Sequence, residues 1–292
     1  MILLTGATGT IGTALLRRLT AAGEPVRCLV RDPRRLRDQR VRVQIALGDL
    51  ANPASFRNAL RGVDTVIHLA ASIRDQPRAS IEELNGVATL RLVRAAERAG
   101  ARRFVFFSAL GASLHSRTRF MRAKALAREA VDESDLETTV FAPSIVYAPG
   151  DPWITLLERF SWLPAVPVSG SGEEVYQPIW AEDVADCVVA SLRVPNGGGD
   201  DFELAGPETL SYDEIVRTVL RPLGRSRPLV HVPLPVVRGS LRALGRLVGP
   251  PVFATWEEAE LMEERMTTAR GTADAESLGV IPRTMSAVLG GP

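Results

Sequence analysis

The sequence predicts an α/β protein with a doubly wound parallel sheet, helices on both faces of that sheet, and a smaller C-terminal substrate lobe. Two observations support this fold class. Short strand-like apolar runs alternate with helix-like runs through residues 1–145, as a doubly wound sheet requires. A glycine-rich turn also separates the first strand from the first helix. The length of 292 residues allows one large α/β domain, or a sheet domain with a smaller lobe.

The strands are expected where apolar residues run together. These runs are 1–4, 26–30, 43–46, 65–69, 103–107 and 138–142. Helices are expected where apolar residues recur at spacings of three and four, at 13–22, 53–60, 82–99 and 120–134. Further along, the segment 179–192 and a short strand at 202–204 return the chain to the core.

Residues 5–12 read Thr-Gly-Ala-Thr-Gly-Thr-Ile-Gly, directly after the first strand. The three glycines lack a Cβ, so they allow unusual φ values and a close approach of the backbone to a pyrophosphate. Free N–H groups at the start of the next helix then face the phosphates. An ordinary turn has similar spacing, but the order strand, turn, helix favours a Rossmann-type site for an NAD(P)-type dinucleotide. We expect the cofactor to contact Gly6, Thr8, Gly9, Thr10, Ile11 and Gly12.

Prolines mark a change in the chain after Pro143. Prolines at 149, 152, 164 and 167 interrupt regular structure, and Gly170 and Gly172 indicate a turn. We therefore expect residues 1–145, completed by 176–205, to form the NAD(P)-binding Rossmann domain. Residues 146–175 and 206–292 are then expected to form the smaller substrate or cap lobe.

Charge and cysteine content narrow the functional classes. The net charge is +1, so no global field recruits nucleic acid or membrane. Cys28 and Cys187 are too few for a disulfide framework, and we expect buried thiols in a reducing cytosol. His68, His115 and His231 lie far apart without neighbouring ligands, so no metal site is predicted. The first residues already form a strand and no apolar run is long enough to span a membrane, so we expect a cytoplasmic protein without a signal peptide.

The residues after the second strand bear on the choice of dinucleotide. An acidic residue there binds the ribose 2′-OH of NAD, whereas an arginine accommodates the 2′-phosphate of NADP. Val30 cannot accept a hydrogen bond and Arg31 offers a cationic fork. We therefore expect NADP(H) to be preferred over NAD(H), with Arg31 and Arg35 at the phosphate. Two alternatives stay open: a shift of one residue puts Asp32 at the ribose, or Arg31, Arg34 and Arg35 form a solvated loop.

Two other strand ends supply candidate cofactor contacts. Asp49, after the third strand, can hydrogen-bond to the adenine, and Leu50 can pack against it. Leu69, Ala70 and Ala71 end the fourth strand, where mostly small side chains allow the cofactor to pass close to the backbone. Core packing explains these three residues equally well.

Further motifs accompany the glycine turn. They are Gly48-Asp49-Leu50, His68-Leu69-Ala70-Ala71, Leu84-Asn85, Phe107-Ser108-Ala109, Lys124 and Pro143-Ser144-Ile145-Val146-Tyr147. Together they resemble the extended and atypical short-chain dehydrogenase/reductase superfamily over nearly the whole chain. Residues 177–185 and 203–208 resemble its branch of NmrA-like proteins and the nucleotide-binding accessory subunit of respiratory complex I. The resemblance implies a cofactor cleft at the carboxyl ends of the strands, with Pro143 and Ile145 beside it, and a C-terminal lobe over the substrate.

The sequence departs from that superfamily at one catalytic position. Most members carry a Ser, a Tyr and a Lys four residues after the Tyr, and the Tyr delivers the proton that accompanies hydride transfer. The resemblance places Ser108 and Lys124 in the catalytic and cofactor-binding site, but position 120 holds Phe. A phenyl ring has no proton to give, and none of the tyrosines at 147, 176 and 212 takes this position. Lys124 can still hold the nicotinamide ribose, unless it is a surface lysine, and Ser108 can still bond to a carbonyl.

Two functional classes follow. The favoured one is an NADPH-dependent reductase of a quinone-like or activated-alkene substrate, whose reduced product takes its proton from water. The alternative is a non-catalytic protein that holds the dinucleotide for redox sensing or for assembly with a partner. A nucleotide-sugar epimerase is a weaker third, because its chemistry relies on the missing Tyr. His115 is either a replacement proton donor or a solvated loop residue. The expected partners are the dinucleotide and an unknown small-molecule substrate, with no nucleic acid.

Residues 235–249 predict an amphipathic helix with an apolar stripe and arginines at 238, 242 and 246. Like charges four residues apart repel each other, and an anionic surface would relieve that repulsion. The pattern is typical of a helix that contacts a membrane interface or a protein partner. A lobe helix whose stripe packs inward and whose arginines are solvated is the favoured interpretation, partly because Gly239 and Gly245 weaken the helix.

Overall fold

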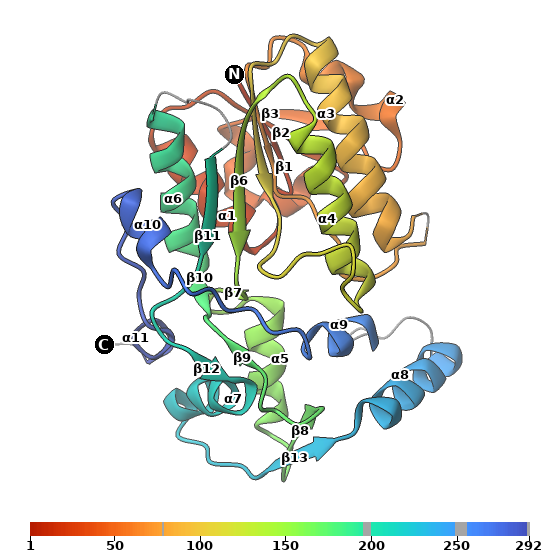
Figure 1. The fold of residues 1–292 in the computed structure, drawn as a ribbon, viewed down its shortest axis with the longest axis vertical. Helices are drawn as coiled ribbons and strands as arrows, with labels where there is room; N and C mark the ends of the chain where they lie inside the picture. The colour runs from red at the N-terminus through yellow and green to blue at the C-terminus, as the bar shows by residue number, and fades with distance from the viewer. Residues whose placement is uncertain (78, 195–199, 249–255, 291–292) are drawn as a thin grey trace.

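A computed structural model describes residues 1–77, 79–194, 200–248 and 256–290. Within these residues a parallel sheet of seven strands forms the centre of the molecule, in the order β11-β6-β5-β4-β1-β2-β3 (Figure 1). Its strands are β1 (Ile2–Thr5), β2 (Val26–Val30), β3 (Gln44–Leu47), β4 (Thr65–His68), β5 (Arg103–Phe107), β6 (Glu137–Pro143) and β11 (Asp200–Leu204). The strand order reverses between β1 and β4, which is where ligands bind in open α/β sheets. This arrangement confirms the predicted Rossmann-type fold.

Helices cover both faces of the sheet. Side chains of β1 alternate between the faces, so that Leu4 joins one apolar cluster and Leu3 joins the other. The first face carries α1 (Thr10–Ala21) and α6 (Ala181–Arg193); the second carries α2 (Pro53–Phe56), α3 (Ala88–Arg98) and α4 (Arg119–Asp132). Because both faces are buried, the central strands are continuous apolar runs. The edge strand β3 is more exposed, with Leu47 at 64%.

The predicted elements match the observed ones within a few residues, with two differences in kind. The helix expected at 53–60 is α-helical over Pro53–Phe56 and continues as a 3₁₀ helix over Arg57–Leu60. The segment 82–99 was expected to be one α-helix, but Glu83–Val87 forms a π-helical turn that precedes α3. The Asn85 side chain lies in this turn and donates to the Ile81 and Ser72 carbonyls, both at 2.7 Å. Apolar spacing alone does not reveal such a turn, because it adds a single residue to the helical repeat. Cys28 and Cys187 are buried free thiols, and burial raises the pKa of each to about 12.

The C-terminal part of the chain lies at the carboxyl ends of the central strands (Figure 1). It contains three short strand pairs, β7 (Val146–Tyr147) with β10 (Ile179–Trp180), β9 (Val175–Tyr176) with β12 (Leu210–Ser211), and β8 (Val166–Ser169) with β13 (Leu229–Val232). Its helices are α5 (Pro152–Phe160), α7 (Tyr212–Leu220), α8 (Leu234–Val248), α9 (Trp256–Leu261), α10 (Ala273–Ser277) and α11 (Met285–Leu289). A third apolar cluster includes Tyr147, Tyr176 and Ile215. Helix α10 differs, since Ala275 packs into the cluster on the first face of the main sheet.

The helix expected at 235–249 corresponds to α8, Leu234–Val248. Residue 249 and the side chains of 242–248 lie outside the described structure, so the expected apolar stripe and arginine row are described only in part. None of the helices in the described part of the chain combines the length and the apolar content that a membrane crossing needs.

Candidate dinucleotide-binding site

The glycine turn joins β1 to α1 and crosses the end of β4. Gly6 has φ +73°, and a Cβ there would lie 2.6 Å from the Ala70 nitrogen. A Cβ on Gly12 would lie 2.1 Å from the Gly6 carbonyl oxygen, although Gly12 does not have a positive φ. The expectation of unusual φ at all three glycines is therefore wrong. Gly6 is required by conformation and space, whereas Gly12 is required because α1 packs tightly on the turn.

Gly9 differs from Gly6 and Gly12, because a Cβ at this position would not collide with the protein. Its φ is −83°, which any residue adopts, and the atom nearest to an added Cβ is the Gly6 oxygen at 3.4 Å. Gly9 is also the N-cap of α1, and no side chain of the described residues caps this helix. The first-turn N–H groups of a helix have no acceptor within it, so they are free for a phosphate. The turn thus fits a pyrophosphate that passes beside Gly9.

A cleft of ≈ 590 Å³ opens over this turn at the carboxyl ends of β1, β2 and β4. It brings together most of the predicted cofactor residues, namely Gly6, Thr8, Gly9, Arg31, Arg35, Asp49, Leu50, Leu69, Ala70 and Ala71. The cleft is also lined by Asp32, the alternative ribose contact, and by Val30, Gly48 and Leu84, which the sequence analysis named without assigning them to the cofactor. The sequence analysis missed four further lining residues, Ala7, Leu29, Ser72 and Gln76. An adjoining cavity of ≈ 430 Å³ shares Arg31, Asp49 and Gln76 with the cleft.

Charged side chains of both signs line the cleft where it meets the ends of β2 and β3. Arg31 and Arg35 line the cleft and are exposed, and neither has an ion-pair partner among residues 1–77, 79–194, 200–248 and 256–290. The Asp32 carboxylate accepts a hydrogen bond from the Arg34 backbone N–H at 3.0 Å and caps the 3₁₀ segment Pro33–Val41. Asp32 is therefore partly engaged, whereas both arginine side chains are available for an anion.

A buried hydrogen-bonded chain lies beneath the cleft and connects β1, β4 and α3. The Ala70 N–H donates to Thr5 Oγ1 at 3.3 Å, and Thr5 Oγ1 lies 2.7 Å from His68 Nδ1. On the other side, His68 Nε2 lies 2.9 Å from Thr89 Oγ1, which donates to the Asn85 carbonyl at 2.6 Å. Because the Thr89 hydroxyl donates to a carbonyl, it accepts from Nε2–H, and Nδ1 accepts from Thr5. His68 is therefore neutral, and burial, with a contribution from Lys124, lowers its pKa to about 3.

Asn85 fixes the far wall of the cleft. Besides the two bonds that its Nδ2 donates, its Oδ1 accepts from the Ser72 N–H at 3.0 Å. The buried Asn85 amide therefore bonds to both the backbone N–H and the backbone carbonyl of Ser72, which lines the cleft. The motif Leu84-Asn85 points to this residue, but its role in shaping the cleft depends on a contact across 13 residues of chain. Spacing in the sequence does not show that contact.

The predicted catalytic residues lie beyond this cleft. Lys124 on α4 is buried, and its Nζ donates to the Phe107 carbonyl at 2.6 Å. Burial lowers the pKa of Lys124 to about 7. Its Nζ also lies 5.1 Å from the Phe106 ring centroid and 5.7 Å from that of Phe120. The alternative of a surface lysine is therefore wrong.

The other residues that were predicted to lie near the nicotinamide follow or end strands β5 and β6. Ser108 follows β5, is half-buried, and donates its N–H to the Phe141 carbonyl at 2.8 Å. Pro143 is buried and accepts from the Leu110 N–H at 3.0 Å, and Ile145 is half-buried against the third apolar cluster. These residues do not line the cleft, and neither do Thr10, Ile11 and Gly12 in the first turn of α1.

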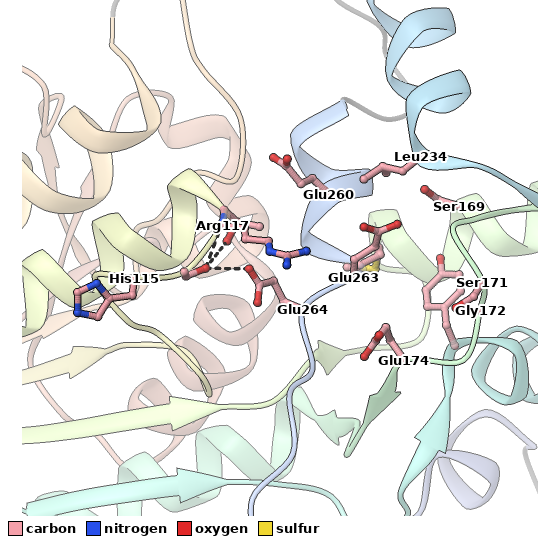
Figure 2. A pocket seen from close by; sticks show the side chains of 14 residues that line it. His115, Arg117, Ser169, Ser171, Gly172, Glu174, Leu234, Glu260, Glu263 and Glu264 are labelled. Atoms are coloured by element: carbon pink, nitrogen blue, oxygen red, sulfur yellow. Dashed lines mark hydrogen bonds between the residues drawn. The ribbon is translucent and has the colours of Figure 1, made fainter.

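A second cavity, of ≈ 690 Å³, lies between the C-terminal part of the chain and the loop that leads from β5 into α4 (Figure 2). Its lining is largely acidic, with Glu174, Glu260, Glu263 and Glu264 around Arg117. Burial and the neighbouring Glu174 and Glu260 raise the pKa of Glu263. His115 is exposed at the edge of this cavity, on the far side from Glu174 (Figure 2).

The glycine turn, the cleft and the strand order together define a Rossmann-fold dinucleotide-binding protein. A family profile described as NAD(P)H-binding matches residues 6–195, and the chain belongs to this family.

Individual relatives agree with the resemblance to atypical short-chain dehydrogenases. The chain is 28% identical to a mitochondrial NADH dehydrogenase 1 alpha subcomplex subunit 9 of Arabidopsis thaliana, over 80% of this chain and 60% of that protein. It is 28% identical to an NAD(P)H azoreductase of Xenophilus azovorans, over 84% of this chain and 82% of that one. A nucleoside-diphosphate-sugar epimerase of Staphylococcus aureus shares the fold, with a TM-score of 0.77, 20% identity and 99% of each chain covered.

We predict that Gly9→Val blocks the dinucleotide while the protein stays folded. The valine fits the backbone at φ −83° but extends into the space for the pyrophosphate. Overpacking of about 1–3 kcal/mol corresponds to a loss of affinity of roughly five- to 150-fold, measured by calorimetry with circular dichroism as the folding check. Gly12→Ala is the matched control, and it should destabilise the fold itself. Unchanged binding by Gly9→Val would show that the turn is only structural.

We also predict a pH-dependent contribution of His68 to stability. In the unfolded chain His68 binds a proton near pH 6.5, whereas in the folded protein it does so near pH 3. The contribution of neutral His68 to the free energy of unfolding is therefore fully present above pH 6.5. It is lost as the pH falls below that value, by about 1.4 kcal/mol per pH unit. Urea unfolding of wild type and His68→Asn at two pH values tests this. The destabilisation by His68→Asn should be about 1–2 kcal/mol smaller at about pH 5 than at about pH 7. Equal differences at both values would contradict a neutral buried His68.

Proposed function

We propose that the protein is an NADPH-dependent reductase of a quinone-like or activated-alkene substrate. The observation that carries the proposal is the pair on α4: Lys124 is retained and buried, while the position of the usual tyrosine holds Phe120. When bound, the nicotinamide cofactor supplies a hydride. An electron-poor double bond accepts that hydride without a positioned acid, because water can protonate the resulting anion.

The residues of this chain then have distinct roles. The glycine turn, with Gly9 at the N-terminus of α1, binds the pyrophosphate, and Arg31 with Arg35 binds the 2′-phosphate of NADPH. Lys124 positions the nicotinamide ribose, and Ser108 donates to an oxygen of the substrate. The substrate is expected to enter from the side of the ≈ 690 Å³ cavity, between residues 1–145 and the lobe of 146–175 and 206–292. The similarity to a protein named as an NAD(P)H azoreductase supports a reductase.

A second candidate is a protein that holds the dinucleotide without turning over a substrate. The burial of Lys124 favours it, because its ammonium is already bonded to the Phe107 carbonyl and lies beside the Phe120 ring. The similarity to a complex I subunit supports it as well. In this case the output is a redox-dependent or structural interaction with a partner.

We predict that NADPH binds at least about tenfold more tightly than NADH, because charge-assisted hydrogen bonds contribute about 1.5–3 kcal/mol. Arg31→Ala should remove most of this preference in calorimetric titrations. Arg34→Ala is the matched control, since Arg34 is exposed nearby but does not line the cleft. Equal affinities of the wild type for NADPH and NADH would rule out the assignment.

We predict that Phe120→Tyr leaves quinone reduction about unchanged and adds weak ketone reduction. A restored phenol beside Lys124 supplies a general acid, which typically contributes about 10²–10⁴-fold. The measurement is NADPH oxidation with quinone, enone and ketone panels, and Phe120→Leu serves as the control that removes the ring without adding a phenol.

The outcomes of this assay separate the two candidates. A cofactor-holding protein should turn over no substrate in either form, with dinucleotide affinity little changed. Strong ketone reduction by the wild type that is abolished by His115→Ala, and unaffected at Phe120, would show instead that the proton donor lies in the β5–α4 loop.

A further inference from the structure

Two loops of the C-terminal part of the chain contact each other. One follows α5 and contains Ser161 and Trp162, and the other follows α7 and contains Arg225 and Arg227. The Arg225 guanidinium lies 3.6 Å over the Trp162 ring and donates to Ser161 Oγ at 2.7 Å. Arg227 donates to the Ser161 carbonyl at 3.1 Å. These contacts fix the two loops as one surface.

This surface exposes large apolar side chains. Trp162 is 75% exposed, Leu163 is 44% exposed and Leu223 is 41% exposed. Beside them, Val230 of β13 is paired with Pro167 of β8 and both are exposed. Single exposed apolar residues are common on proteins, but a tryptophan exposed to this degree within an apolar group indicates an interaction site.

The charged side chains around this surface are mostly positive. The segments 158–169 and 220–232 contain four arginines, at 159, 221, 225 and 227, and one acid, Glu158. Arg159, Arg221 and Arg227 are exposed, whereas Glu158 is half-buried. Asp213, the acid nearest to β13, is already engaged by Arg217 and His231. The surface therefore presents uncompensated positive charge beside exposed indole and leucine side chains.

We propose that this Trp162 patch, defined as Trp162, Leu163, Leu223 and the arginines at 159, 221, 225 and 227, docks on an anionic lipid surface. Tryptophan suits the boundary between headgroups and acyl chains, because one end of the indole is apolar and the ring carries a polar N–H. Arginines beside it contact phosphate headgroups while their stems cover apolar surface. A protein interface of ordinary size has an apolar core depleted in charge, whereas here few apolar groups lie among four cations. Charge complementarity thus favours the lipid surface.

The proposal implies weak, reversible and salt-dependent binding. Each arginine near an anionic membrane strengthens binding roughly fivefold, and this attraction is screened within a Debye length. The contact does not depend on α8, nor on whether the protein is a reductase, so the proposal and the proposed function fail separately.

Co-sedimentation of the full-length protein with vesicles tests the proposal. We expect binding to phosphatidylcholine vesicles with about 30% phosphatidylglycerol at low salt, and its loss in pure phosphatidylcholine or at about 0.5 M NaCl. Trp162→Glu should lower binding at least roughly tenfold, and Arg221→Ala should lower it roughly fivefold. Val41→Glu is the matched control, because Val41 is 81% exposed near the β3 edge of the sheet, and its binding should equal that of the wild type.

Circular dichroism and dinucleotide affinity should be unchanged in all variants, which shows that the fold is intact. As a second measurement, wild-type tryptophan fluorescence should shift to shorter wavelength on addition of anionic vesicles, and Trp162→Phe should remove the shift. Absence of vesicle binding at low salt would overturn the proposal. Equal binding by wild type, Trp162→Glu and Arg221→Ala would also overturn it, because another surface, such as α8, would then make the contact.

Discussion

The dinucleotide cleft depends on the two hydrogen bonds that the neutral ring of His68 makes. The ring connects the end of β1, through Thr5, with α3, through Thr89, and the same chain of hydrogen bonds reaches the Ala70 N–H that lines the cleft. Gly6 adds a steric constraint, since a Cβ there would collide with the same Ala70 nitrogen. The distance between the glycine turn and the end of β4 is thus set both by these hydrogen bonds and by the steric contact of Gly6 with Ala70. Such buried networks are stable only when every donor and acceptor is paired, and here the directions of all four bonds are consistent with one tautomer.

Much of the fold could be predicted because its determinants are local. The central strands are buried on both faces, so they stand out as apolar runs, and the glycine turn lies within eight consecutive residues. The errors arose where one pattern has more than one physical cause. The spacing of Gly6, Gly9 and Gly12 is compatible with a conformational, a steric or a ligand-binding role. Among these three glycines the structure assigns the conformational role to Gly6 alone and a steric role to Gly6 and Gly12. Ser72 was missed because the bonds of Asn85, which lies on another element, hold it at the cleft, and Gln76 donates in turn to the Ser72 hydroxyl.

Burial of charge determines the surroundings of Lys124, the residue that was predicted to hold the nicotinamide ribose. Lys124 is removed from water and has one hydrogen-bonding partner among the described residues, the Phe107 carbonyl, so its pKa falls to about 7. The same cation contributes to the lowered pKa of His68, because a second positive charge nearby is unfavourable in a medium that screens poorly. A tyrosine at position 120 would place a polar group near this ammonium, whereas Phe120 leaves only the face of a ring. The substitution therefore changes the surroundings of Lys124 as well as removing an acid.

The dinucleotide cleft and the ≈ 690 Å³ cavity differ in charge, although the chain as a whole has a net charge of +1. The cleft is lined by two arginines, Arg31 and Arg35, and two aspartates, Asp32 and Asp49, while the cavity is lined by four glutamates and one arginine. An anionic dinucleotide is therefore repelled from the cavity, whereas the charges that line the cleft balance. The repulsion matters most inside the cavity, where burial and the proximity of Glu174 and Glu260 already raise the pKa of Glu263. The excess of acidic groups in the cavity therefore depends on where the fold places charged side chains rather than on the overall composition.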